Sequence, residues 1–348
     1  MKFATRCARN VRITLQAACG LKKGESLVVC ATRAGTRYTS AERIRTYSTA
    51  FASVASELGA FPVILDLTEF VSTGRYRSGL SCNAITSVLS SADVVVYLSD
   101  TLSPARLLGR KGNDDFVLTG TRRHFFVQAH GIERWSIDSS QVRAARIRTR
   151  WLAGLLRGAR EMRLASPAGT DLVFNLSRGC SCTPVLGIVP LYAEVAVAPR
   201  EGSGEGLLVV DGPTQRGVRP AAECDRTPLR IQIENGRMRS VSGDREQVSR
   251  LRAFVSAGSP RADRIDEIGV PTTRMPENDR FWWSDGTHRC RTVHVALGNN
   301  LSRARQVHGV QHMDGEVRHP TVWVDGRKIL DRGYFAAGPA AERKPSGD

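Results

Sequence analysis

No run of apolar residues in this chain of 348 approaches the roughly 18 residues that a membrane-spanning helix requires. The N-terminal stretch MKFATRCARNVRITLQ lacks the continuous apolar segment of a secretory signal peptide. The eight cysteines include no CxxC pair, and several lie in apolar segments typical of buried strands. These absences argue against a membrane protein and against a disulfide-bonded secreted domain. We therefore expect a cytoplasmic protein with reduced thiols and no membrane partner.

Lysine is scarce, because only six of the fifty basic residues are lysine, and arginine supplies most of the formal net charge of +16. A positive charge of this size invites a nucleic-acid interpretation, since phosphate contacts come from lysine and arginine. The arginines are nevertheless spread over the whole chain and do not cluster between aromatic residues. We expect no nucleic-acid partner, although a positive field would favour an anionic substrate group such as a carboxylate.

The closest pair of cysteines is in GCSC, at residues 179–182. Two thiols at this spacing can bind a soft metal ion. No second pair of cysteine or histidine residues accompanies them at the spacing of a zinc finger. Reduced, buried thiols are the alternative interpretation.

The length exceeds what one core usually organises, so we expect two domains. Residues 1–164 alternate strand and helix patterns. Short apolar runs bounded by turn residues predict strands at 26–31, 62–67, 92–99 and 124–129. Helical spacing follows over 39–59, where Thr39 and Glu42 fit a capping box and Gly59 fits the stop. This pattern predicts an α/β domain with a mainly parallel sheet. The first strand is not followed by a GxGxxG motif, so the sequence does not imply a bound dinucleotide.

The second half has a different texture. An amphipathic stretch at 139–162 links the halves, and short strands separated by turns follow it. The Asn-Gly pair at 235–236 and the Asp-Gly pair at 325–326 are typical of β-hairpins. We expect a β-rich α+β domain over 165–335 that carries the chemistry, followed by a disordered tail at 336–348.

Histidine is rare, but five of the seven histidines lie within 32 consecutive residues: His288, His294, His308, His312 and His319. In VQHMDG a strand places His312 and Asp314 on one side, because residues i and i+2 point the same way. In VHVALG the alternation places His294 opposite its valine neighbours. Two imidazoles and a carboxylate form a metal-ligand set. The alternative is a solvated strand face that binds nothing.

The number of carboxylates decides between two kinds of metal site. His, His and Asp suit a mononuclear Fe(II) facial triad, whereas two ions about 3.5 Å apart need further bridging carboxylates. Two acids have unusual settings: Glu194 is alone in the apolar PLYAEVAVAP, and Glu267 in RIDEIGVP precedes a glycine-containing turn after a helical segment. Each taken alone is more often a surface glutamate or a structural partner of an arginine.

Four segments, PLYAEVAVAP, DEIGVP, VHVALG and VQHMDGEVRHPTVWVDG, resemble in their order the motifs of the dinuclear metallo-aminopeptidases of the aminopeptidase T (leucyl aminopeptidase) type. The resemblance extends over most of the chain. It implies a homodimer that hydrolyses an N-terminal peptide bond, with a metal-bound hydroxide attacking the scissile carbonyl. It also implies two divalent metal ions, Zn, Co, Mn or Mg, and metal ligands at Glu194, Glu267, His294, His312 and Asp314.

The segment HVALGNNLSRA lacks the tyrosine that this family carries a few residues after its first ligand histidine. The resemblance therefore implies a specialised peptide or small amide substrate. A related group, the 2,5-dihydroxypyridine dioxygenases, is similar in fold and in the closing His-x-Asp, and uses one Fe(II) held by two histidines and an aspartate. A peptide-binding protein without catalysis is the third alternative.

Overall fold

The protein is described here as a computed structural model. The structure describes residues 2–33, 39–72, 83–98, 123–127, 131–176, 180–189, 192–214, 217–257, 261–273, 291–298 and 312–339. The chain divides into two compact units, one of residues 1–146 with 185–193 and the other of residues 147–184 with 194–348. The division thus falls inside helix α7 (Ser139–Arg157), whereas domains of 1–164 and 165–335 were expected. Of the tail predicted at 336–348, residues 340–348 lie outside the described residues.

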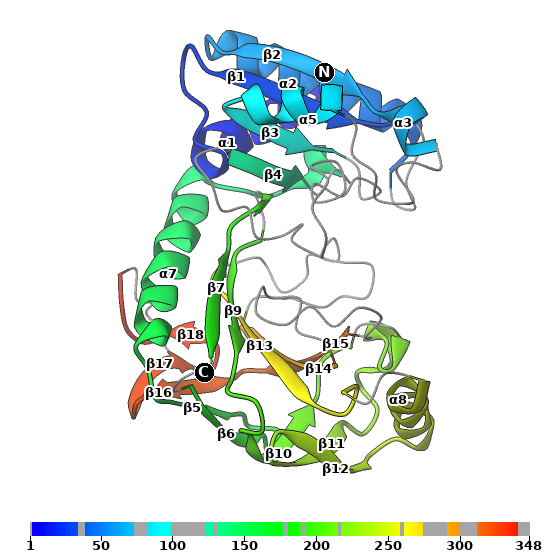
Figure 1. The fold of residues 1–348 in the computed structure, drawn as a ribbon, viewed down its shortest axis with the longest axis vertical. Helices are drawn as coiled ribbons and strands as arrows, with labels where there is room; N and C mark the ends of the chain where they lie inside the picture. Colours follow the sequence, from blue (N-terminus) through cyan, green and yellow to red (C-terminus); the bar gives the residue numbers. More distant parts are fainter. Residues whose placement is uncertain are drawn as a thin grey trace. The chain divides into compact units, whose positions relative to one another are not determined.

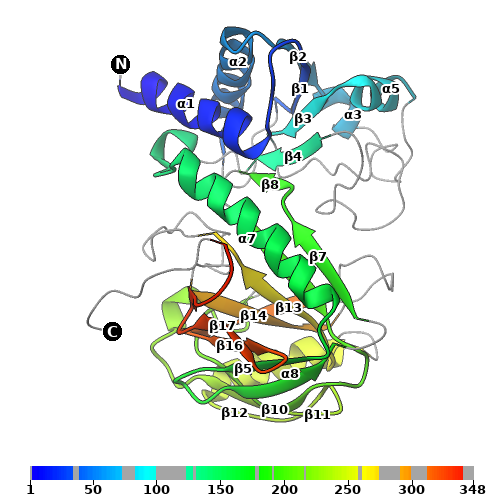
Figure 2. The same cartoon turned by 90° about the vertical axis from the view of Figure 1, so that its left-hand side faces the viewer.

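The first unit is built on a parallel sheet, in the order β2-β1-β3-β4-β8, of which β1 to β4 are labelled in Figure 1 and β8 in Figure 2. Its elements besides the start of α7 are α1 (Lys2–Ile13), η1 (Thr14–Ala18), β1 (Ser26–Ala31), α2 (Ala41–Glu57), β2 (Phe61–Asp66), α3 (Thr68–Ser72), α5 (Asn83–Ser91), β3 (Val94–Tyr97), β4 (Arg123–Val127), η3 (Ile132–Arg134) and β8 (Ile188–Val189). Helix α1 lies beside α2 (Figure 2). The predicted α/β domain with a parallel sheet is confirmed.

Helix α2 shows how the local sequence makes this unit. Its apolar side chains recur at helical spacing, and Tyr47 and Phe51 among them are fully buried in a helix that contacts α1, β1 and β2. The N-cap is Ser40, whose side chain accepts a hydrogen bond from the backbone N–H of Arg43. The capping box expected from Thr39 is therefore wrong by one residue. Gly59 follows the last turn with a φ of 76°, the left-handed conformation expected of a helix stop.

The second unit contains two sheets, in the strand orders β12-β11-β10-β6-β5-β16-β17-β18 and β15-β14-β13-β9-β7. Its elements besides the end of α7 are β5 (Glu161–Ala165), β6 (Asp171–Asn175), β7 (Ser181–Val185), β9 (Glu194–Ala198), β10 (Glu205–Val210), η5 (Ala221–Glu223), β11 (Leu229–Glu234), β12 (Arg237–Ser242), α8 (Arg245–Ala257), β13 (Ile265–Pro271), β14 (Thr292–Gly298), β15 (His312–Arg318), β16 (Thr321–Val324), β17 (Arg327–Asp331) and β18 (Tyr334–Phe335). One hydrophobic core receives side chains from both sheets. The predicted β-rich second part is confirmed.

Both predicted hairpins are confirmed. Asn235 and Gly236 join β11 to β12, and Asp325 and Gly326 join β16 to β17. All four residues have positive φ, as a two-residue turn that matches the twist of its strands requires. In the part of the chain that the structure describes, no helix combines the length and the apolar composition needed to cross a bilayer. The cytoplasmic location stays a prediction.

A buried arginine organises the loop between β10 and β11. Arg219 is fully buried, and its guanidinium donates hydrogen bonds to the backbone carbonyls of Cys224, Arg226 and Thr227, at 2.9, 3.0 and 3.1 Å. It also donates to the side-chain Oε1 of Gln247 on α8, at 2.5 Å. The planar fork of arginine reaches four acceptors in different directions, which a single ammonium group cannot do.

We expect Arg219→Lys to lower the free energy of unfolding by about 3 kcal/mol, because several buried carbonyls lose their donors. Urea denaturation followed by circular dichroism measures the loss. Arg226→Lys is the matched control, since Arg226 is largely solvent-exposed and its ion pairs contribute little; it should change stability by less than about 0.5 kcal/mol. Equal stability of the two variants would contradict the organising role of Arg219.

Candidate metal centre

One face of the five-stranded sheet carries the ionisable residues that the sequence singled out. In β14, Val293 belongs to the hydrophobic core, so its neighbour His294 lies on the opposite face. In β15, Met313 belongs to the same core, so His312 and Asp314 on either side of it lie on the opposite face. The expected strand positions of these three residues are therefore present. All three side chains are buried, so the solvated strand face is excluded for them.

Strand pairing aligns these side chains across the sheet. Two rows cross β15, β14 and β13 on this face, the first of Glu316, His294 and Gly269, and the second of Asp314, Ala296 and Glu267. Glu194, the first residue of β9, pairs with Pro271 at the end of β13. Glu267 thus lies within a strand, and the expected position before a turn after a helical segment is wrong.

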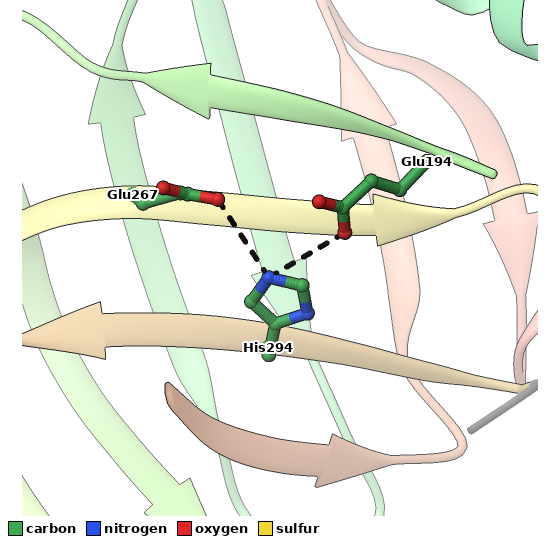
Figure 3. A group of neighbouring side chains, drawn as sticks. All are labelled: Glu194, Glu267 and His294. Atoms are coloured by element: carbon green, nitrogen blue, oxygen red, sulfur yellow. Dashed lines mark ion pairs between the residues drawn. The ribbon is translucent and has the colours of Figure 1, made fainter. Parts of the chain in front are cut away.

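The three side chains of Glu194, Glu267 and His294 converge (Figure 3). His294 Nε2 lies 3.5 Å from Glu194 Oε2 and 3.8 Å from Glu267 Oε1. Each residue offers one ligand atom, and these atoms lie within 4.8 Å of one another. Among the described residues this is a buried group that can hold a metal ion.

His312 and Asp314 form a separate close pair in β15. Their Nε2 and Oδ1 atoms are 2.8 Å apart, and both side chains are buried. Asp314 is close enough to His294 to be the strongest of the charges that act on it. The structure therefore places all five predicted ligands on one face, with three converging and the other two paired beside them.

The His294 ring fits because the residue beside it on β13 is glycine. A Cβ atom added to Gly269 would lie 1.9 Å from both Cε1 and Nε2 of His294. No side chain is compatible with that distance, so the ring occupies the space that a Cβ would fill. The next row has the small Ala296 between Asp314 and Glu267. Small residues thus make room for the cluster.

The charge state of His294 follows from its neighbours. Burial acts to lower the pKa of this imidazole, but the surrounding negative groups outweigh burial and raise the pKa to about 10. These groups are Asp314, Glu194 and Glu267. Without an ion, His294 is therefore an imidazolium near neutral pH. A divalent cation at this place would take over the same role of offsetting the carboxylates.

The donor set fits a divalent transition-metal ion. Two imidazoles and several carboxylates are nitrogen and oxygen donors, and two histidines with one carboxylate on neighbouring strands are the ligands of mononuclear Fe(II) oxygenases. Sequence reasoning missed Glu316, which is fully buried in the same row as His294. The strand alternation that selected His312 and Asp314 predicts the same face for residue 316, and extending the pattern by two residues would have found it.

Comparisons with known proteins identify relatives of the whole chain. The sequence model of a family described as NicX, 2,5-dihydroxypyridine 5,6-dioxygenase, matches residues 11–337. No curated protein sequence matches the chain. The solved structure of 2,5-dihydroxypyridine dioxygenase from Pseudomonas putida has a TM-score of 0.65 at 15% identity, covering 97% of this chain and 98% of that one. Wild-type AmpT from Thermus thermophilus has a TM-score of 0.58 at 14% identity, covering 96% and 100%.

The expected membership of the aminopeptidase T type is wrong, and so is the dinuclear metallopeptidase that hydrolyses peptide bonds. The family match covers nearly the whole chain and describes a dioxygenase, which is an oxidoreductase and not a hydrolase. AmpT shares the fold, so short motifs in the same order indicated the fold and not the activity. The alternative that was drawn from the closing His-x-Asp agrees better with the family match.

We expect Gly269→Ala to weaken the binding of a divalent ion roughly tenfold or more, because the new methyl group displaces the His294 ring. Isothermal titration with a divalent ion measures the affinity. Gly315→Ala is the control: it adds a methyl group on the neighbouring strand, 2.9 Å from Val210 Cγ2. It should lower stability and leave the affinity unchanged. Equal losses in both variants would show a general loss of folding instead.

Metal binding at this cluster should release about one proton per ion near pH 7. The pKa of His294 is raised, so the protonated form prevails below about pH 10, and the ion requires the neutral imidazole. The affinity should therefore rise about tenfold per pH unit from pH 7 towards pH 10. Calorimetry in buffers of different ionisation enthalpy counts the protons. A pH-independent affinity over this range would contradict the raised pKa.

Proposed function

The chain belongs to the 2,5-dihydroxypyridine 5,6-dioxygenase family, and we propose that it is a metal-dependent dioxygenase that opens a hydroxylated, nitrogen-containing aromatic ring. The observation that carries the proposal is the match of the family over residues 11–337. The candidate centre supports it, because His294, His312 and Asp314, buried on one face of paired strands, are nitrogen and oxygen donors of the kind that Fe(II) accepts. The substrate class is dihydroxylated pyridines, in place of the peptide or amide substrate that the peptidase resemblance implied.

In this proposal His294, His312 and Asp314 hold one Fe(II) ion, in place of the two divalent ions expected earlier. All three are buried and lie on one face of neighbouring strands. When bound, Fe(II) supplies the redox centre that allows molecular oxygen to react with an aromatic ring. Three protein ligands leave coordination positions open for small molecules. The protein's own contribution is to fix these ligands on two paired strands, where the backbone hydrogen bonds limit their movement.

Glu194 and Glu267 have a different task in the same site. Both carboxylates lie within 4 Å of His294 Nε2, the ring atom that would face the ion. A dihydroxypyridine must release a hydroxyl proton to bind as an anion, and a buried carboxylate at this site would accept that proton. We assign proton acceptance to one of these two glutamates. The positive field of the arginine-rich chain favours the anionic form of such a ring.

Some expectations keep the status of predictions. The homodimer, the cytoplasmic location and the absence of nucleic-acid and membrane partners are proposals for this protein. The five residues predicted from the sequence are proposed as the site, with the division of roles given above.

The first test is metal content together with ring-dependent oxygen uptake. Protein purified without a chelating tag and loaded anaerobically with Fe(II) should bind one iron per chain and consume one O₂ per 2,5-dihydroxypyridine. Asp314→Asn should lose the iron, because a ligand carboxylate is replaced by a neutral amide. Plasma mass spectrometry and an oxygen electrode measure the two quantities. Two ions per chain with cleavage of a peptide amide would overturn the proposal, and so would a protein that binds no metal.

The glutamates provide the second test. Glu267→Gln should keep its iron and lower turnover by roughly a hundredfold, because the proton acceptor is lost and the ligands are not. Glu194→Gln is compared with it to identify the acceptor. Glu161→Gln is the matched control, since Glu161 is exposed on β5. It should leave iron content and turnover unchanged. If both Glu267→Gln and Glu194→Gln keep full turnover, neither glutamate accepts the proton.

A further inference from the structure

Two thiols form a close pair beside the sheet that carries the candidate metal centre. Cys180 and Cys182 have their Sγ atoms 3.7 Å apart, within hydrogen-bonding distance for sulfur. Cys182 lies in β7, the strand at one end of the five-stranded sheet, and Cys180 immediately precedes that strand. Residues two positions apart in an extended chain point to the same side, which explains why the two thiols meet.

The surroundings of the pair differ from those of the metal ligands. Both cysteines are partly buried and pack against the hydrophobic core of the second unit, with part of their surface exposed to solvent. The metal ligands point away from that core, so the thiols lie on the other side of the sheet. The proposed dioxygenase chemistry therefore makes no use of them.

The pair has one reactive member. Either thiol can donate the hydrogen bond of the pair, and when Cys182 donates it, the bond lowers the pKa of Cys180 to about 7, against the opposing effect of burial. The same hydrogen bond raises the pKa of Cys182, with burial adding to the effect. Near neutral pH a substantial fraction of Cys180 is therefore thiolate, the form that attacks disulfides, while Cys182 retains its proton.

We propose that Cys180 and Cys182 are a redox-active dithiol, which closes to an intrachain disulfide by exchange with a small-molecule disulfide such as oxidised glutathione. The Cys180 thiolate attacks one sulfur of the small disulfide, which forms a mixed disulfide and releases one small thiolate. That thiolate takes the proton of Cys182. The Cys182 sulfur then attacks the Cys180 sulfur and displaces the second small thiolate, which takes a proton from water. One small disulfide is consumed, and the protein loses two thiols.

The geometry predicts that this disulfide is easily reduced again. Two residues apart in an extended strand, the Cα atoms are separated by about 6.7 Å, at the upper end of the roughly 4.4–6.8 Å range of disulfides. Closing the bond strains the chain, and strained disulfides are the labile ones. Cys180 precedes the first residue of β7, so part of the strain falls outside the strand. A permanent structural crosslink is not expected from this geometry.

A bound soft metal ion is the competing explanation of the close thiols. A stable site of that kind usually has four ligands. Within the described residues, the group of three or more potential ligands is Glu194, Glu267 and His294, and neither cysteine belongs to it. Two thiols alone favour disulfide exchange over a metal site.

The chain offers a clean measurement. Trypsin should release residues 179–200 as one peptide that contains Cys180 and Cys182 and no other cysteine. The full-length folded protein is incubated in glutathione buffers of increasing oxidised fraction, quenched with acid, alkylated and digested. We expect this peptide to become lighter by two hydrogen atoms and resistant to alkylation, with full return after dithiothreitol.

Two variants make the result decisive. In Cys182→Ser the second attack is impossible, so a stable glutathione adduct on Cys180 should accumulate. Cys224→Ser is the matched control, because Cys224 is also a partly buried free cysteine, but its thiol donates a hydrogen bond to the carbonyl of Pro220 instead of to another thiol. In this variant the disulfide between Cys180 and Cys182 should form as before. A lasting glutathione adduct in the unaltered protein would overturn the proposal. Protection that a chelator removes and a reductant does not would also overturn it, in favour of a soft metal ion.

Discussion

Several acids are buried on one face of a single sheet, and they require a positive charge among them. Glu194, Glu267 and Asp314 lie around His294, and burial strengthens the repulsion between like charges. In the metal-free protein the imidazolium of His294 offsets this repulsion, which explains its raised pKa. A divalent cation can take its place once the imidazole loses a proton. The missing side chain of Gly269 contributes to the same arrangement, because it leaves room for the His294 ring close to both glutamates.

This arrangement depends on a sheet whose two faces are both buried for different reasons. In β14 every residue is buried, yet Val293, Val295 and Leu297 enter the hydrophobic core while His294 lies on the other face. A shift of the pairing by one residue would put the imidazole into the core and a valine among the carboxylates. The apolar residues therefore fix the register of the strand, and the register fixes the site. Within the seven residues of β14, alternate residues therefore serve the stability of the core and the chemistry of the site.

The sequence predicted much of the fold because its patterns are local. Alternation identified the strands at His294 and His312, and the Asn235-Gly236 pair identified a hairpin, since each depends on neighbours in the chain. Glu267 was placed before a turn that follows a helical segment, because its own neighbours do not reveal that it pairs with Ala296. The role of Gly269 was invisible for the same reason, because it concerns a side chain on another strand. Glu316 was within reach of the strand pattern and was overlooked.

The chemistry could not be predicted from the motifs, because the order of motifs along the chain reflects the order of the strands and not the reaction. The strand pattern put His294, His312 and Asp314 on strand faces, and the resemblance added Glu194 and Glu267 to the same set. The number of ions and the reaction depend on where the side chains point. Glu194, Glu267 and His294 converge, while His312 turns to Asp314. Such differences arise from the spacing between strands and from small residues such as Gly269, which carry no chemistry of their own. A family match over residues 11–337 draws on nearly the whole chain, whereas four short motifs cover only a few of its positions.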